Sequence, residues 1–309
     1  MQESGERPPI SLRSRRWALL VVLTVLFLGF DYLMTGLWRL SEGREMAFPQ
    51  GAYVGLFVLQ IDLIAFWTAF GLGRIVVRLP WALLAITLTY IAHQKGASRF
   101  IPYEVPPSEQ LVLAGILLFG WLAATLSLLG YRLVTRRRLT LSDQATDSSR
   151  KFHLQHLILG TALFGVTFAM LNWFGYPVPD VFHFEGQLLF ALSVAAVVNL
   201  VTVIPAIACA FRLWESWPAR HLILAVICLT LTVVEIIVLC AVLGMPPDFA
   251  RAFAFLALIN FVQGFGLFWT LSWFRLAGYD LRVVDGVLKS ETEVESPPPI
   301  DADPWTQDD

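Results

Sequence analysis

The chain has 309 residues, of which 57% are hydrophobic and only 15% are charged, and its mean hydropathy is +0.65. Soluble domains are usually about half apolar and about a quarter charged, so this composition excludes an ordinary soluble globular protein. The net charge of −2 comes with no basic face of interleaved aromatic residues, so no nucleic-acid partner is predicted. We therefore expect an all-α polytopic membrane protein whose first partner is the lipid bilayer.

The chain opens with a basic segment, residues 1–16, followed by an apolar run from Trp17 to Trp38. A basic segment before an apolar run is also typical of a cleavable signal peptide. This run is longer than a signal core and carries no small-x-small cleavage site, so the sequence predicts a first membrane span.

Eight apolar runs approach the roughly 20 residues that a helix needs to cross the hydrocarbon core. They cover residues 17–38, 52–73, 75–93, 110–132, 152–174, 188–211, 220–243 and 252–276. The run at 75–93 has the shortest apolar core, and its alternative is a re-entrant or interfacial segment.

The distribution of Lys and Arg supports eight spans with the N-terminus inside. With this topology 17 of the 22 basic residues lie on one side, and the other side keeps only Arg39, Arg44, Lys95, Arg99 and Arg251. Basic residues concentrate in cytoplasmic loops, so we expect a protein of the bacterial cytoplasmic (inner) membrane with both termini in the cytoplasm. Removing the third span moves later basic loops to the outer side and spoils the split.

Polar breaks divide the chain into parts. After Arg282 the sequence carries eight acidic residues, one lysine and a triple proline, a composition typical of disorder. The predicted parts are a basic cytoplasmic N-terminus (1–16), a first four-helix unit (17–135), a basic cytoplasmic linker (136–151), a second four-helix unit (152–280) and an acidic disordered cytoplasmic tail (281–309).

The two four-helix units resemble each other in sequence. Segments 15–38 and 150–173 have equal length, begin with paired basic residues and end in Trp, and the offset that carries Arg15 onto Arg150 also carries Gly51 onto Gly186. The peptide GYRL (130–133) also resembles GYDL (278–281). A duplicated four-span unit predicts a 4+4 parallel tandem repeat about an axis along the membrane normal. The alternative is that membrane helices share Leu, Phe and basic flanks.

Three carboxylates lie inside the predicted spans: Asp31, Asp62 and Glu235. An ionisable residue at membrane depth is destabilising by at least a few kcal/mol, which makes it a functional candidate. Helical spacing places Thr24, Thr35 and Trp38 on the face of Asp31, so we expect a thin polar stripe that points into the bundle. Glu235 has Cys228 and Thr232 on its side of the helix, whereas Gln60 lies on a different face from Asp62.

Two further spans supply neutral polar groups. Asn199 and Thr202 share a face just before Pro205, which removes a backbone donor and predicts a kink in that span. Asn260, Gln263 and Gly264 share a face of the last span, where the glycine allows close approach of another helix. The candidate ion- or substrate-binding residues are Asp31, Asp62, Glu235, Asn199, Asn260 and Gln263.

Two hypotheses explain the carboxylates. In the first they converge on a hydrated cavity and bind a proton, a cation or a cationic substrate, which predicts two carboxylates within about 6 Å of each other. In the second each carboxyl bonds a Thr, Asn or Gln of a neighbouring helix and ties the bundle together. The leading expectation is a non-enzymatic structural or interaction protein with a membrane-protein partner or a second copy of itself. The alternatives are a small-molecule transporter or proton/cation-coupled permease, and thirdly an intramembrane lipid-modifying enzyme.

Motifs that carry catalysis or bind metals are not recognisable in the sequence, so no catalytic residue, metal site or cofactor is predicted. The peptide HLQH (His153 and His156) has i, i+3 spacing and lacks the Glu of a zinc-protease helix. The three cysteines lie in apolar runs, where cysteine usually behaves as a small buried hydrophobe: Cys209, Cys228 and Cys240.

The segment FHLQHLILGTALFGVTFAMLNW (152–173) resembles a helix opening of uncharacterised multi-pass membrane proteins of planctomycete bacteria. Phe152, Leu154, Leu157 and Thr161 carry the resemblance, whereas the residues at 153 and 155 depart from the usual Ser and Arg. The resemblance covers this one segment, implies a bacterial source and implies no activity.

Overall fold

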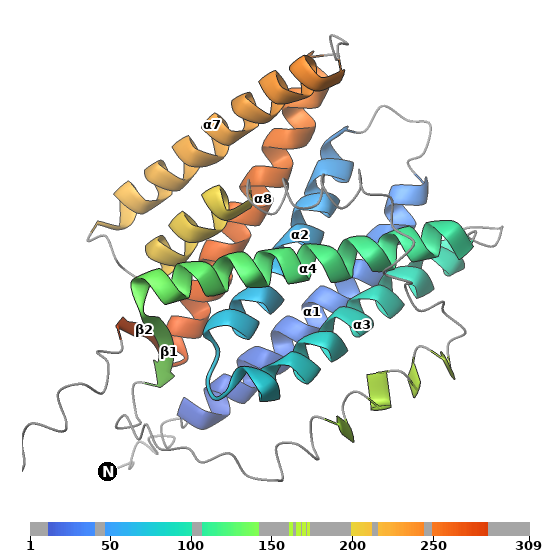
Figure 1. Cartoon of the computed structure of the whole chain (residues 1–309). Coiled ribbons are helices and arrows are strands. Elements are labelled where there is room, and N and C mark those ends of the chain that lie inside the picture. Colours follow the sequence, from blue (N-terminus) through green and yellow to red (C-terminus); the bar gives the residue numbers. More distant parts are fainter. Residues whose placement is uncertain are drawn as a thin grey trace, which may run out of the picture.

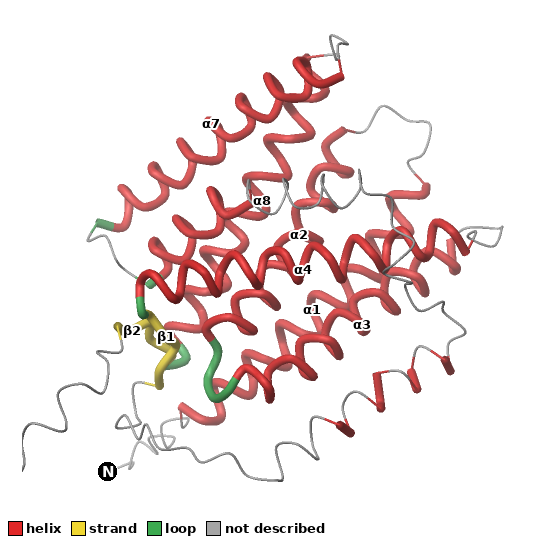
Figure 2. The backbone as a smooth tube through the Cα atoms, viewed as in Figure 1, coloured by secondary structure: helices red, strands yellow, loops and turns green. Residues whose placement is uncertain are grey.

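The structure, a computed structural model, describes residues 12–40, 47–100, 107–141, 161–162, 165–167, 169–170, 172–173, 199–211, 216–243 and 249–283. The long helices are α1 (Leu12–Leu40), α2 (Ala47–Phe70), α3 (Ile75–Phe100), α4 (Pro107–Thr135), α7 (Trp217–Leu243) and α8 (Phe249–Leu276). A shorter apolar helix runs over Asn199–Ala210. Two short strands, β1 (Arg137–Leu141) and β2 (Tyr279–Val283), follow α4 and α8 (Figure 2).

Six helices in the described ranges are long and apolar enough to cross a membrane, so the chain is a helical multi-pass membrane protein. They correspond to six of the eight predicted spans. The helix predicted at 75–93 is longer than expected and continues to Phe100. Its last residues are mostly polar, so the apolar run used for the prediction ends before the helix does. The predicted span 152–174 and the first part of 188–211 fall mostly outside the described residues.

Helix α2 lies at the centre of the described bundle. It packs most extensively against α8, then against α4 and α3, while α1 packs mainly on α3 and α7 on α8 (Figure 1). The core that results combines apolar side chains of α2 and α8 with those of α4 and the short helix, including Phe70, Leu117, Ile207 and Leu267.

The close packing of α2 on α8 depends on two glycines one helical turn apart, Gly51 and Gly55. A Cβ at Gly51 would lie 2.7 Å from the carbonyl oxygen of Phe255, and one at Gly55 would lie 2.8 Å from that of Ile259. Small residues four apart are the usual means by which membrane helices approach closely. The two backbones are therefore in contact along this seam.

The two strands pair antiparallel at the end of the bundle where α4 and α8 finish (Figure 1). Each strand follows a residue with positive φ, Arg136 at 53° and Gly278 at 89°, which ends the preceding helix. Leu139 and Leu281 form the central pair of the register and are both buried. An all-α chain was predicted, and the strand pair is a departure from that expectation.

Three pairs of elements begin at one constant offset in the sequence. Helices α3 and α4 and strand β1 begin at positions 75, 107 and 137, and α7, α8 and β2 begin at positions 217, 249 and 279. The offset that carries each member of the first set onto its counterpart is identical for all three pairs. It also carries Arg136 onto Gly278 and Leu139 onto Leu281.

This offset, from position 75 to position 217, is larger than the one that the sequence comparison suggested, from position 15 to position 150. The peptides that prompted part of that comparison are also not structurally equivalent, because residues 130–133 lie inside α4 whereas residues 278–281 form a turn and the start of β2. The resemblance of GYRL to GYDL is therefore a coincidence of sequence.

Candidate functional site

Asp62 lies in the middle of α2 and is completely buried. Asn199 donates a hydrogen bond to its Oδ1 atom, and Gln263 of α8 donates one to its Oδ2 atom at 2.8 Å. The amide of Gln263 also donates to the side-chain oxygen of Asn199. Three of the predicted site residues therefore form one cluster that joins α2, α8 and the short helix.

Glu235 forms a second, separate tie between α7 and α8. The side-chain amide of Asn260 donates to Glu235 Oε2 at 2.7 Å and to Thr232 Oγ1 at 3.1 Å. Cys228 donates its thiol proton to the backbone carbonyl of Asn260 at 3.3 Å. Thr232 and Cys228, placed on the side of Glu235 by helical spacing, thus belong to its contact with α8.

Asp31 forms the third tie, between α1 and α2. It is completely buried, and its Oδ1 atom accepts a hydrogen bond of 2.8 Å from Gln60. The hydroxyl of Thr89 on α3 donates to the Gln60 oxygen at 3.4 Å. The sequence did not identify Gln60 as the partner of Asp31. Helical spacing showed only that Gln60 and Asp62 lie on different faces of α2.

The positions of Gln60 and Asp62 decide how the two aspartates are related. Residues two apart on a helix point to nearly opposite sides. Gln60 meets Asp31 on one side of α2, and Asp62 meets Gln263 on the other. The two aspartates therefore lie on different sides of the central helix.

The expected polar stripe beside Asp31 is wrong at Thr24. That side chain is exposed and donates back to the carbonyl of Leu20 in its own helix at 2.8 Å. The beginning of α1 has few neighbours among the described residues, so a residue seven positions before Asp31 does not face protein. The side chains of Thr35 and Trp38 lie outside the described residues.

Gly264 confirms the expected close approach on the last span. A Cβ at this position would lie 2.9 Å from Cys228 Sγ and 3.1 Å from Thr202 Cγ2. The short helix and α7 therefore both contact α8 at this level, next to the Asp62 cluster.

A second polar feature lies at the basic end of the bundle, where α2 finishes. The last carbonyls of a helix lack intrahelical partners. Here the Trp67 carbonyl accepts from the backbone N–H of Gly71, and arginines of two neighbouring helices supply further donors. Arg78 donates to the Trp67 carbonyl at 3.2 Å, and Arg132 donates to the Ala69 carbonyl. Loop charge counts identified these arginines only as topology signals.

The described residues also bear on the requirements of a metal site, and the states of the cysteines are clear. Within those ranges no three His, Cys, Asp or Glu side chains gather in a way that fits a metal ion. Cys209 and Cys228 are buried, Cys240 is half-buried, and all three are free thiols. The peptide with His153 and His156 lies outside the described residues.

Comparison with known proteins adds no relative. No family model, no curated protein and no solved structure matches the chain. The resemblance to planctomycete membrane proteins therefore stays a prediction, and function is argued from the geometry. The described structure is that of a helical membrane protein in which two buried carboxyls and one half-buried carboxyl join neighbouring helices through side-chain amides.

Proposed function

We propose that the chain is a non-enzymatic structural or interaction protein of the bacterial cytoplasmic membrane. The observation that carries the proposal is that all three intramembrane carboxyls accept hydrogen bonds from an amide of another helix. Asp31 meets Gln60, Asp62 meets Gln263, and Glu235 meets Asn260. Such contacts stabilise a bundle by about 1 kcal/mol or less each, and they suit a rigid body better than a transport path.

The proposal includes eight spans arranged as a 4+4 parallel repeat, with both termini in the cytoplasm. The constant offset between equivalent elements supports the repeat. In an antiparallel pair the two strands are related by a two-fold axis through the centre of the register, and Leu139 and Leu281 occupy that centre. A parallel repeat about the membrane normal requires such an axis between its halves.

Buried arginines at equivalent positions add support at the level of side chains. Arg78 and Arg220, which are related by the same offset, are both buried in the first turns of α3 and α7. Arg78 bonds the carbonyl of Trp67, and the carbonyl of Arg220 accepts from Cys209, the residue that the offset places opposite Trp67. The same two positions thus contact each other in both halves, through a guanidinium in the first and a thiol in the second, which supports the proposed repeat.

Substitution of Asp62 tests the structural role. Asp62→Asn keeps the shape and one acceptor oxygen for the neighbouring amides, so we expect a folded protein with the wild-type phenotype in the cell. Asp62→Leu removes both acceptors, so Asn199 loses the carboxylate to which it donates and the buried Gln263 amide keeps only the Asn199 oxygen; we expect a loss of about 1–3 kcal/mol in unfolding free energy. Phenotypic loss in the folded Asp62→Asn variant would contradict the proposal.

A proton-coupled transporter is the second candidate, because Asp62 lies between α2 and α8, at the interface of the two halves. Parallel-repeat transporters bind substrates and ions at this interface. The two candidates are separated in proteoliposomes that contain a pH-sensitive dye. A structural protein gives the same proton flux as empty vesicles in both wild type and Asp62→Asn, whereas a transporter gives a flux that Asp62→Asn abolishes.

A further inference from the structure

Three arginines form a basic cluster at the end of the bundle where α2 and α4 finish and α3 begins: Arg78, Arg132 and Arg138 (Figure 1). Arg78 is only 3% exposed, Arg132 is half-buried and Arg138 is exposed. Arg78 and Arg132 bond backbone carbonyls two residues apart at the end of α2, and β1, which carries Arg138, packs against both α2 and α4. The cluster therefore combines an exposed, a half-buried and a buried positive charge.

The partners that hold two of these arginines are neutral. Arg78 and Arg132 bond the carbonyls of Trp67 and Ala69, which orients the guanidinium groups and leaves their charge in place. Within the described ranges, the side chain of Arg138 makes neither a hydrogen bond nor an ion pair. The cluster thus concentrates positive charge that no described carboxylate neutralises.

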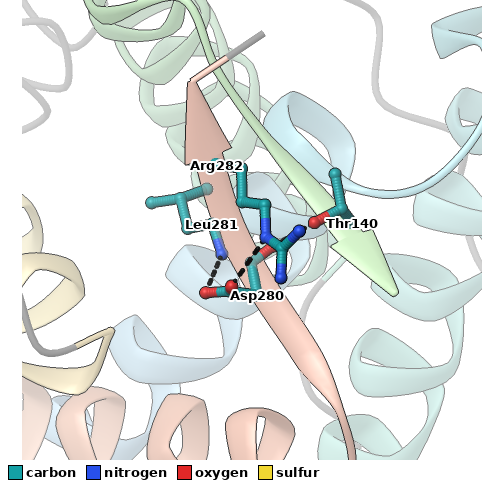
Figure 3. Close-up of polar contacts among 4 residues, drawn as sticks. All are labelled: Thr140, Asp280, Leu281 and Arg282. Atoms are coloured by element: carbon teal, nitrogen blue, oxygen red, sulfur yellow. Dashed lines mark hydrogen bonds and ion pairs between the residues drawn. The ribbon is translucent and has the colours of Figure 1, made fainter. Parts of the chain in front are cut away.

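The acid of the strand pair is already engaged elsewhere. Asp280 accepts a hydrogen bond from the backbone N–H of Leu281 and pairs with Arg282 Nε, each at 2.9 Å (Figure 3). Arg138 stands directly opposite Arg282 in the register, and like charges at such positions are destabilising. A bound anion relieves this repulsion.

The surroundings of the cluster indicate what carries the anion. Leu126, Leu133 and Val134 on α4 are 67%, 78% and 84% exposed, and α4 is one of the helices able to span a membrane. In a bilayer, this exposed apolar face of α4 offers a surface for acyl chains up to the level of Arg132. Basic sites between membrane helices on the cytoplasmic side bind anionic headgroups.

We propose that the basic cluster binds the phosphate of an anionic phospholipid, with the acyl chains along α4; its place in the inner leaflet rests on the proposed cytoplasmic position of both termini. The phosphate oxygens accept hydrogen bonds from Arg138 and Arg132, in the bidentate geometry that guanidinium groups favour. Arg78 beneath them adds a fixed positive charge. The acidic segment 284–309, which follows β2 directly, is the competing occupant that the experiment distinguishes.

The test titrates the full-length protein in a nonionic detergent with phosphatidylglycerol or phosphatidylcholine and counts bound lipids by native mass spectrometry. Near an anionic surface each basic residue strengthens binding roughly fivefold. We expect Arg138→Gln to weaken phosphatidylglycerol binding about fivefold, and Arg138→Gln with Arg132→Gln to weaken it about 25-fold. Phosphatidylcholine binding stays unchanged. Arg251→Gln, in the first turn of α8 at the other end of the bundle, is the matched control and keeps full affinity.

Four results overturn the proposal. The first is equal affinity of the wild type for the two lipids, and the second is undiminished phosphatidylglycerol binding by Arg138→Gln, which changes an exposed side chain and leaves the helix ends intact. The third is a lipid preference that emerges only when the acidic residues of 284–309 are replaced by Asn and Gln, which assigns the cluster to that segment. Soluble glycerol phosphate is included, and binding as tight as that of the lipid also refutes a membrane ligand.

Discussion

The contact between α2 and α8 at Gly55 allows a quantitative prediction, because a substitution there can be compared with one that changes helix propensity alone. A Cβ at Gly55 would lie 2.8 Å from the Ile259 oxygen, 3.1 Å from Ile259 Cα and 2.9 Å from Val262 Cβ. Carbon atoms prefer about 3.5–4.0 Å, and two of the three contacts are with backbone. Gly55→Ala therefore forces α8 to move, since no rotamer change relieves the contact.

Two terms of opposite sign determine the result. Overpacking destabilises by about 1–3 kcal/mol, whereas Gly→Ala inside a helix stabilises by about 0.5–1 kcal/mol. Gly130→Ala in α4 is the matched control, because no atom lies within 4 Å of its Cβ position and only the favourable term acts. We expect Gly55→Ala to be less stable than Gly130→Ala by about 1–3 kcal/mol.

Reversible unfolding in mixed micelles with increasing dodecyl sulfate, followed by circular dichroism, measures both variants against the wild type. The expected order of stability is Gly130→Ala, wild type, Gly55→Ala. Equal stability of the two variants would refute the close approach of α2 and α8, because the propensity term is common to both.

Further predictions concern the helix ends and the ties. Arg136→Gly removes a left-handed non-glycine residue and should raise the unfolding free energy by about 1 kcal/mol; an unchanged or lower value in the same micelle titration would contradict that backbone. Asn260→Leu removes the amide that donates to Glu235 Oε2 and Thr232 Oγ1 and should destabilise by about 1–2 kcal/mol, and wild-type stability would show that the tie contributes nothing. Arg138→Cys with Arg282→Cys should form a disulfide on mild oxidation, visible as a gel shift, because the positions are directly opposite; Arg138→Cys with Val283→Cys, one residue out of register, should not.

The sequence predicted the membrane class and the positions of the long helices because hydrophobic length is a local property. The run predicted at 110–132 became Pro107–Thr135, and the run at 252–276 became Phe249–Leu276. The strands escaped prediction, since RRLTL and YDLRV are short and charged and acquire strand structure only through each other. Their pairing joins a segment from the middle of the membrane region to one at its end, which no local pattern indicates.

The candidate site was predictable in its residue types and only partly in its pairs. The amides of Asn199, Asn260 and Gln263 were identified from their faces, but which carboxyl each one meets depends on how the helices are rotated and offset. Gln60 illustrates the limit, because its face was known and its partner Asp31 lies on another helix. The spacing of Gly51 and Gly55 is a sequence signal for close helix packing, and this signal was missed.

The strand pair has a consequence for how the protein is made. Strand β1 ends at Leu141 and its partner β2 begins only at Tyr279, so at about 5–20 residues per second the delay between their syntheses is roughly 7–30 s. During that time β1 is an unpaired edge on a nascent membrane protein, and charged side chains protect such edges from mispairing. Arg137 and Arg138 give β1 that protection, and the closing of the two strands is a step that must await the end of translation of the membrane region.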